Sequence, residues 1–148
     1  MCKKLLFLLA AAVLLLQGAR AQQPGRAGII VASPDGKLSI AALDKDITIR
    51  NAQTQKAIAR LRGHTDAITA LAVSPNGRFL ASGSQDKSVA LWEIPAGKQL
   101  LRIQCGNPVV SVSISADGKN LIARTNDKTT TELEIATGKV LRKVQEKK

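Results

Sequence analysis

Three residues of the types that perform nucleophilic catalysis lie close together in the middle of this chain: His64, Ser82 and Asp86. A serine activated by a histidine, which an aspartate in turn orients, is the arrangement found in serine hydrolases. The same side chains also suit a structural role, because buried polar groups need hydrogen-bonding partners and each of these could satisfy another. We expect the structural role, and we predict no catalytic residue and no enzymatic activity.

These residues lie within a unit that occurs three times. A Ser-Pro-Asp-Gly-Lys segment is followed by altered copies at intervals of 41 residues, so that the three lie at residues 33–37, 74–78 and 115–119. An Asp-Lys pair follows each copy, with the aspartates Asp44, Asp86 and Asp127. A period near 40 residues is typical of one supersecondary unit stacked on its neighbours. We expect repeats at about residues 29–62, 63–104 and 105–148.

Each repeat has the pattern of short strands separated by turns. Runs rich in Val, Ile, Leu and Ala end at turn residues such as Pro-Asn-Gly and Pro-Ala-Gly, and no helical period is seen after residue 21. In the middle repeat the expected strands are residues 67–73, 79–84, 88–94 and 99–103. In the outer repeats they are residues 40–43, 47–49, 57–61, 109–114, 121–124, 133–135 and 140–144. Short connections favour antiparallel neighbours, so the sequence predicts an all-β fold of three four-stranded meanders.

The middle repeat resembles a WD40 repeat. The resemblance is carried by Gly63-His64, by Leu-Ala-Ser-Gly-Ser-Gln-Asp at residues 80–86, and by Val-Ala-Leu-Trp-Glu at residues 89–93. Glu93 stands where the family usually has aspartate. In that family a histidine, a serine, an aspartate and a tryptophan form a buried network that ties one blade together, and here they are His64, Ser82, Asp86 and Trp92. The resemblance implies a partial β-propeller whose blades have four strands each.

The outer repeats keep less of this pattern and are degenerate. Counting from their aspartates, the tryptophan position is Arg50 or Leu133, and the serine position is Ile40 or Ala123. Cys105 takes the histidine position of the third repeat.

The first residues have the features of a secretory signal peptide. Lys3 and Lys4 precede an apolar run over residues 5–16, and Ala19-Arg20-Ala21 offers small residues for cleavage. The run is shorter than the roughly 20 residues that a membrane-spanning helix needs. We expect a helical signal peptide at 1–21, cleaved after Ala21, and a linker at 22–28. The mature chain would have no transmembrane span and would be exported to the periplasm or the extracellular space.

Metal and cofactor chemistry is disfavoured by residue type. Zinc sites use three or four His and Cys ligands, whereas the mature chain offers only His64 and Cys105. Asp44, Asp86 and Asp127 stand one per repeat, unlike the clustered oxygen ligands of a calcium loop. We expect these aspartates to cap turns and Cys105 to be a core residue. Neither a metal nor a cofactor is predicted.

Three repeats raise a question of closure, because propellers close with about four to eight blades. An open arc would expose two blade faces, which we expect to be apolar. A head-to-tail homodimer of six blades would cover both faces. The alternative is that the chain is a truncated fragment of a larger WD40 protein.

The resemblance implies a scaffold that binds a protein partner through its loops. The contact residues we predict there are Thr65, Asp66, Gln85, Lys87 and Asn126. The net charge of +11 also allows an anionic surface as partner, since six cations fall at turns expected on the opposite face: Lys37, Lys56, Arg78, Lys98, Lys119 and Lys139. Nucleic acid is disfavoured because Phe79 and Trp92 are the only aromatic residues after the leader. An exported propeller enzyme with a site in its central cavity is a second hypothesis, which the mostly apolar inner strands support poorly.

Overall fold

The computed structural model of the chain describes residues 28–147, which form three four-stranded antiparallel sheets. Blade 1 consists of β1 (Ile29–Ala32), β2 (Leu38–Leu43), β3 (Asp46–Asn51) and β4 (Ala57–Leu61). Blade 2 consists of β5 (Ile68–Val73), β6 (Phe79–Ser84), β7 (Ser88–Glu93) and β8 (Lys98–Gln104). Blade 3 consists of β9 (Val109–Ile114), β10 (Asn120–Thr125), β11 (Thr129–Glu134) and β12 (Val140–Gln145). Each sheet keeps its strands in chain order, and the predicted all-β architecture of three blades is confirmed.

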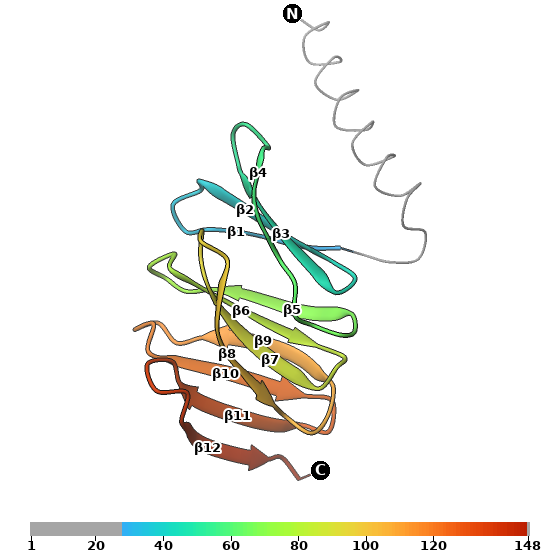
Figure 1. The fold of residues 1–148 in the computed structure, drawn as a ribbon. Coiled ribbons are helices and arrows are strands. Elements are labelled where there is room, and N and C mark those ends of the chain that lie inside the picture. Colours follow the sequence, from blue (N-terminus) through green and yellow to red (C-terminus); the bar gives the residue numbers. More distant parts are fainter. Residues whose placement is uncertain (1–27, 148) are drawn as a thin grey trace, which may run out of the picture.

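The three sheets stack face to face, with blade 1 and blade 3 at opposite ends of the stack (Figure 1). The expected signal peptide, and the linker apart from Gly28, lie outside the described residues. Within residues 28–147 no helix is long and apolar enough to cross a membrane.

Two strand predictions differ from the structure. No strand was predicted at Ile29–Ala32, yet β1 pairs with β2 along its full length. In blade 3 the third strand is Thr129–Glu134 rather than residues 133–135, because its threonines pair with β10 on one side and β12 on the other. Apolar runs alone were a poor guide there, since a strand rich in threonine can be half buried.

The repeated Ser-Pro-Asp-Gly-Lys segments form the turn between the first two strands of each blade. In blade 1 the Ser33 hydroxyl donates to the Asp35 carboxylate, which also accepts the Lys37 N–H at 2.9 Å. Gly36 has a φ of 73°, a conformation that glycine adopts without strain. The corresponding serines of the other blades, Ser74 and Ser115, make the same kind of bond. The sequence echo therefore encodes one turn used three times.

Two apolar cores lie between the blades. One joins blade 1 to blade 2, and includes Ile40, Ile49, Leu80 and Trp92. The other joins blade 2 to blade 3 and includes Val89, Leu91, Leu121 and Leu133, with Cys105 at its margin. Blade 2 contributes one face to each core, which is why its strands β6 and β7 are buried almost throughout.

The β2–β3 turn of blade 1 is one residue shorter than its counterparts. Two residues separate Leu43 from Asp46, whereas three separate Ser84 from Ser88 in blade 2. Because of this deletion, counting back from Asp44 gave Ile40 as the counterpart of Ser82. Strand register gives a different counterpart. Ser39 lies opposite Arg50 as Leu80 lies opposite Trp92, so Ser39 is equivalent to Leu80. Two residues further on, Ala41 is then equivalent to Ser82.

Candidate functional site

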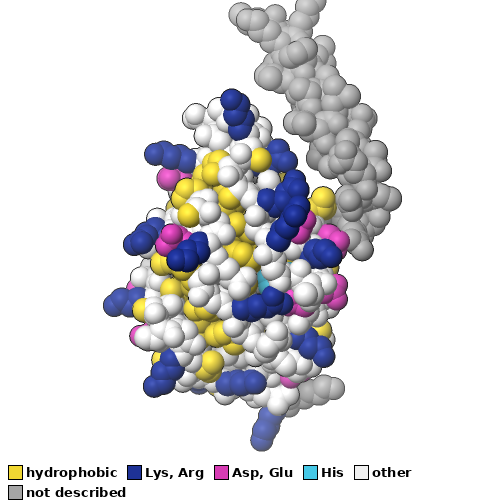
Figure 2. Space-filling model, in the orientation of Figure 1, with side chains coloured by type: hydrophobic (Ala, Val, Ile, Leu, Met, Phe, Trp, Pro, Cys, Tyr) yellow, Lys and Arg dark blue, Asp and Glu magenta, His cyan; other side chains and the backbone are white. Residues whose placement is uncertain are grey.

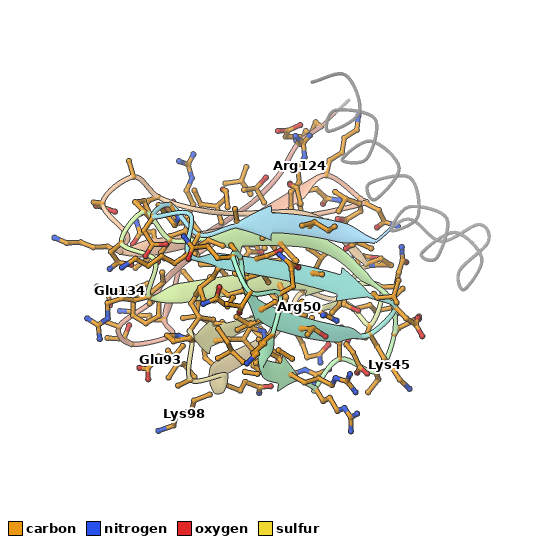
Figure 3. The ribbon with its side chains drawn as sticks, turned by 90° about the horizontal axis from the view of Figure 1, so that it is seen from above. Lys45, Arg50, Glu93, Lys98, Arg124 and Glu134 are labelled. Atoms are coloured by element: carbon orange, nitrogen blue, oxygen red, sulfur yellow. The ribbon has the colours of Figure 1, made fainter. Side chains whose placement is uncertain are left out.

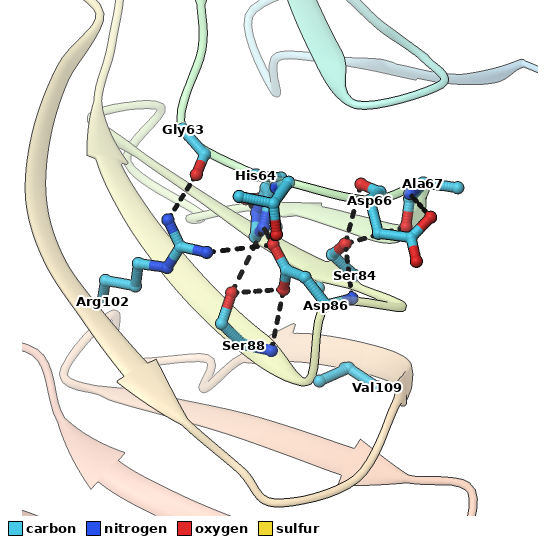
Figure 4. A network of polar contacts seen from close by, with 12 residues as sticks. Gly63, His64, Asp66, Ala67, Ser84, Asp86, Ser88, Arg102 and Val109 are labelled. Carbon is cyan, nitrogen blue, oxygen red and sulfur yellow. Dashed lines mark hydrogen bonds and ion pairs between the residues drawn. The ribbon is translucent and has the colours of Figure 1, made fainter.

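A chain of hydrogen bonds runs through blade 2 from Trp92 to Asp86, and Figure 4 shows the part of it around His64 and Asp86. The Trp92 indole N–H donates to Ser82 Oγ at 2.9 Å, and Ser82 Oγ lies 2.7 Å from His64 Nε2. His64 Nδ1 lies 2.9 Å from Asp86 Oδ2. A carboxylate only accepts, so Nδ1 donates to Asp86, and Nε2 then accepts the Ser82 proton. Every member of the chain is satisfied with a neutral imidazole.

Asp86 is the centre of this network. Its Oδ2 also accepts the Thr65 N–H at 3.0 Å and Arg102 at 3.0 Å, while its Oδ1 accepts from the Ser88 N–H and hydroxyl. Burial by itself raises the pKa of Asp86, but the bonds from Ser88, the Thr65 N–H and His64 outweigh it and lower the pKa to about 2. The carboxylate therefore stays ionised at neutral pH, joining the β4–β5 connection to the β6–β7 turn.

The order of contacts from Ser82 through His64 to Asp86 is that of a catalytic triad. The serine hydroxyl, however, is not accessible to a substrate. Ser82 is fully buried, and its Oγ already accepts the Trp92 N–H. His64 is only 6% exposed. A nucleophile must reach its substrate, and this hydroxyl has no exposure to solvent. The network is a structural clamp.

Sequence reasoning missed two members of this network, Ser88 and Arg102. Arg102 on β8 donates to the Gly63 carbonyl and to Asp86, which fixes the segment just before His64 (Figure 4). No pattern in the sequence marks Arg102. Ser88 did carry a signal, because a hydroxyl residue flanks the turn aspartate on both sides in blades 2 and 3: Ser84, Ser88, Thr125 and Thr129.

The outer blades show what remains when the histidine and tryptophan are lost. Asp127 still caps its turn by accepting from Thr125, from the Thr129 N–H and from Asn107. Asp44 instead occupies the shortened turn with a φ of 57°, so it is not the geometric equivalent of Asp86. Cys105 is buried at the histidine position, and burial raises the pKa of its thiol.

The predicted partner-binding residues all lie at one end of the stack. Thr65 and Asp66 belong to the β4–β5 connection, Gln85 and Lys87 to the β6–β7 turn, and Asn126 to the β10–β11 turn. All five are exposed. Their backbone is nevertheless held, since the N–H groups of Thr65, Gln85 and Asn126 donate to Asp86, Ala67 and Pro108. We call these five residues the loop surface.

The opposite end of the stack carries the six predicted turn cations. The Ala52 N–H donates to the Lys37 carbonyl, and Ile94 and Ile135 make the same bond to Arg78 and Lys119, so both turns of each blade meet there. Acidic residues lie among them, since Glu93 pairs with Lys98 across β7 and β8, and Figure 3 shows Glu93, Glu134 and Lys98 at one end and Lys45 at the other. Figure 2 shows the same mixture of charges over the stack. This end is basic but not uniformly so.

Among residues 28–147 no three His, Cys, Asp or Glu side chains are grouped in a way that could hold a metal ion.

The fold and the network define the class: three consecutive blades of a β-propeller. Residues 55–93 match the family model described as "WD domain, G-beta repeat", a segment that runs from the end of the β3–β4 turn through β7. Mouse striatin-4 is 38% identical over 84 residues, which cover 56% of this chain and 11% of striatin-4. The ribosome biogenesis protein BOP1 homolog of Drosophila virilis is 43% identical over 51 residues, covering 34% of this chain and 6% of that protein. The chain therefore contains a WD40 repeat at residues 55–93, and it spans about a tenth or less of these relatives.

Solved structures show the same fold. The WD40 repeats of RRP9 superpose with a TM-score of 0.76 at 19% identity, covering 82% of this chain and 40% of that one. Hydrazine synthase of Kuenenia stuttgartiensis superposes with a TM-score of 0.73 at 23% identity, covering 79% of this chain and 35% of that one. At such identities the likeness shows the fold alone.

Proposed function

We propose that this chain is an exported, non-catalytic module that binds a protein partner through the loop surface, and that two copies join head to tail to complete a propeller. The observation that carries the binding proposal is the loop surface itself. It presents exposed side chains on a backbone held by hydrogen bonds to Asp86, Ala67 and Pro108, and prearranged groups lose less entropy on binding. The one triad-like cluster is closed to substrates, which favours binding over catalysis.

A protein partner suits the loop surface better than an anionic polymer suits the opposite end. The loop surface combines Thr, Asp, Gln, Lys and Asn side chains. Together they offer hydrogen-bond donors and acceptors, one negative charge and one positive charge. At the opposite end Glu93, Glu134, Asp35 and Asp117 lie among the cations and weaken the positive field.

The binding proposal is tested by a charge change on the loop surface. In the Gln85→Glu/Lys87→Glu variant, we expect cross-linking to partners in an extract of the source cells to fall while the melting temperature stays the same. The matched control is Gln53→Glu/Lys56→Glu, which makes the same charge change at the opposite end of the stack. An equal fall in both variants would show a general charge effect, and a loss of folding in the first variant would remove the assignment.

Export and self-association have separate tests. The full chain, expressed in a bacterial host with a C-terminal tag, is expected in the periplasm with Gln22 as its first residue by mass spectrometry. Intact Met1 in the cytosol would contradict export. Light scattering on the purified protein is expected to give a discrete dimer. An unfolded or polydisperse sample would indicate instead that the blades belong to a longer propeller, in line with the small share of each relative that they cover.

A further inference from the structure

The two end faces of the stack differ from the four blade faces that are buried in the two apolar cores. For each blade we call the face toward the next blade its leading face and the face toward the previous blade its trailing face. In blades 1 and 2 the leading faces pack into the apolar cores, and strand register identifies their central residues as Ile40, Ile47 and Ile49 and as Ala81, Val89 and Leu91.

The leading face of blade 3 carries polar residues at these same positions. Ile122 takes the place of Ala81, but Thr130 and Glu132 stand where blade 2 has Val89 and Leu91, and Arg124 stands where it has Gly83. A shallow hollow of about 270 Å³ lies on this face, lined by Ile122, Thr130, Glu132, Arg142, Val144 and Glu146. The expectation that both open faces are apolar is therefore wrong.

The trailing face of blade 1 is altered in a complementary way. Ser39, Thr48 and Arg50 stand where blade 2 has Leu80, Ala90 and Trp92. Arg50 lies on the face of blade 1 that is turned toward the viewer in Figure 3, and Arg60 is exposed on the same face, opposite Thr48. Within residues 28–147 neither arginine pairs with a carboxylate. Ile30, 72% exposed, and Leu43, 43% exposed, are large apolar side chains of this face.

The internal cores indicate which of these residues would meet in a head-to-tail contact. Leu91 on the leading face of blade 2 shares a buried cluster with Leu133 on the trailing face of blade 3. In the same way Ile49 on the leading face of blade 1 shares the other cluster with Trp92 on the trailing face of blade 2. The corresponding positions across an intermolecular seam are Glu132 of one copy and Arg50 of the second. These two charges are opposite, and Arg124 on the same blade 3 face is already paired with Glu146 at 2.7 Å.

We propose that two copies join through a polar seam, in which the leading face of blade 3 meets the trailing face of blade 1 with Glu132 opposite Arg50, and that this seam opens reversibly with salt. The proposal rests on the self-association proposed above. Internal seams are apolar, like obligate interfaces, whereas seams that mix charged and apolar side chains are typical of partners that also exist apart. The dimer is thus a ring with two permanent seams in each copy and two labile seams between copies.

The charged seam makes predictions that an apolar seam does not. Sedimentation equilibrium of the purified chain is expected to show at least about tenfold weaker dimerisation when salt rises from about 0.05 M to about 1 M, because screening shortens the reach of charges. Arg50→Glu is expected to weaken the dimer about tenfold, and Arg50→Glu/Glu132→Arg to restore it, since the charges are exchanged in both seams. Arg78→Glu, at a turn away from both faces, is the control. Circular dichroism checks that each variant is folded, and Arg60→Glu replaces Arg50→Glu if that variant is not.

The outcomes separate the two proposals. A dimer that neither salt nor charge reversal weakens would leave self-association standing and overturn the polar seam. Equal weakening by Arg78→Glu, or no recovery in the exchanged variant, would also overturn it. A monomer at every salt and protein concentration would overturn both the seam and self-association, while the binding proposal for the loop surface would be unaffected.

Discussion

Ser82→Ala is the sharpest test of the buried network in blade 2. The substitution removes an oxygen that accepts the Trp92 indole N–H and donates to His64 Nε2, at a position with no exposure to solvent. Two buried polar groups then lose their partners, at about 1–3 kcal/mol each. We expect the free energy of unfolding to fall by about 3 kcal/mol, a large part of the roughly 5–15 kcal/mol typical of a domain.

Trp92 provides the assay, because it is the only tryptophan in the chain and is buried in the network. Its fluorescence reports urea unfolding directly at the altered site. With a urea slope of about 1.5 kcal/mol/M, the midpoint is expected to fall by about 2 M. Thr65→Ala is the control, because it removes an exposed hydroxyl but keeps the N–H that donates to Asp86, and it should leave the midpoint unchanged. A loss below about 0.5 kcal/mol in Ser82→Ala would refute the argument that this hydroxyl holds both partners.

Two further predictions concern acid stability and the closeness of the blades. The folded state holds the pKa of Asp86 at about 2, below the ordinary 3.8, so its contribution to stability is present above about pH 4 and is lost as the pH falls toward 2. Asp86→Asn should therefore be less stable at neutral pH and should lose less stability between about pH 4 and about pH 2, as followed by acid titration of Trp92 fluorescence. Gly83→Ala places a Cβ against Val109 and within 3.0 Å of Val112, so it is expected to cost about 1–3 kcal/mol in urea. Adding Val109→Ala should recover part of that loss, and strict additivity of the two substitutions would count against a clash between blades 2 and 3.

The sequence predicted the fold well because the repeats carry redundant signals. Turn chemistry, apolar runs and a 41-residue frame all agreed on four strands per unit, and the resemblance in blade 2 placed the strands in a propeller. The errors occurred where only one signal was available. The threonine-rich β11 had no apolar run, and β1 is a run of only four residues.

The candidate site was partly predictable for a related reason. His64, Ser82, Asp86 and Trp92 could be recognised as a set, but Arg102 could not, since its role depends on β8 passing beside Gly63. The charges of the end faces were also present in the sequence. Their meaning required the strand register, because only register shows that Glu132 and Leu91 occupy equivalent places in successive blades.

The central position of blade 2 has a consequence for cooperativity. Both apolar cores use a face of this blade, and the hydrogen-bonded clamp lies within it. In an array of repeats with equal interfaces, a unit that unfolds loses only the contacts with its direct neighbours. An end unit has one neighbour and therefore unfolds first. Here an opening of blade 2 removes the neighbours of blades 1 and 3 together, so amide hydrogens of β6 and β7 should exchange only when the whole chain opens. The amide hydrogens of the outer strand β12, which is exposed along its length, should exchange by local fraying. The three blades are therefore expected to unfold as one cooperative unit, with only this edge strand opening independently.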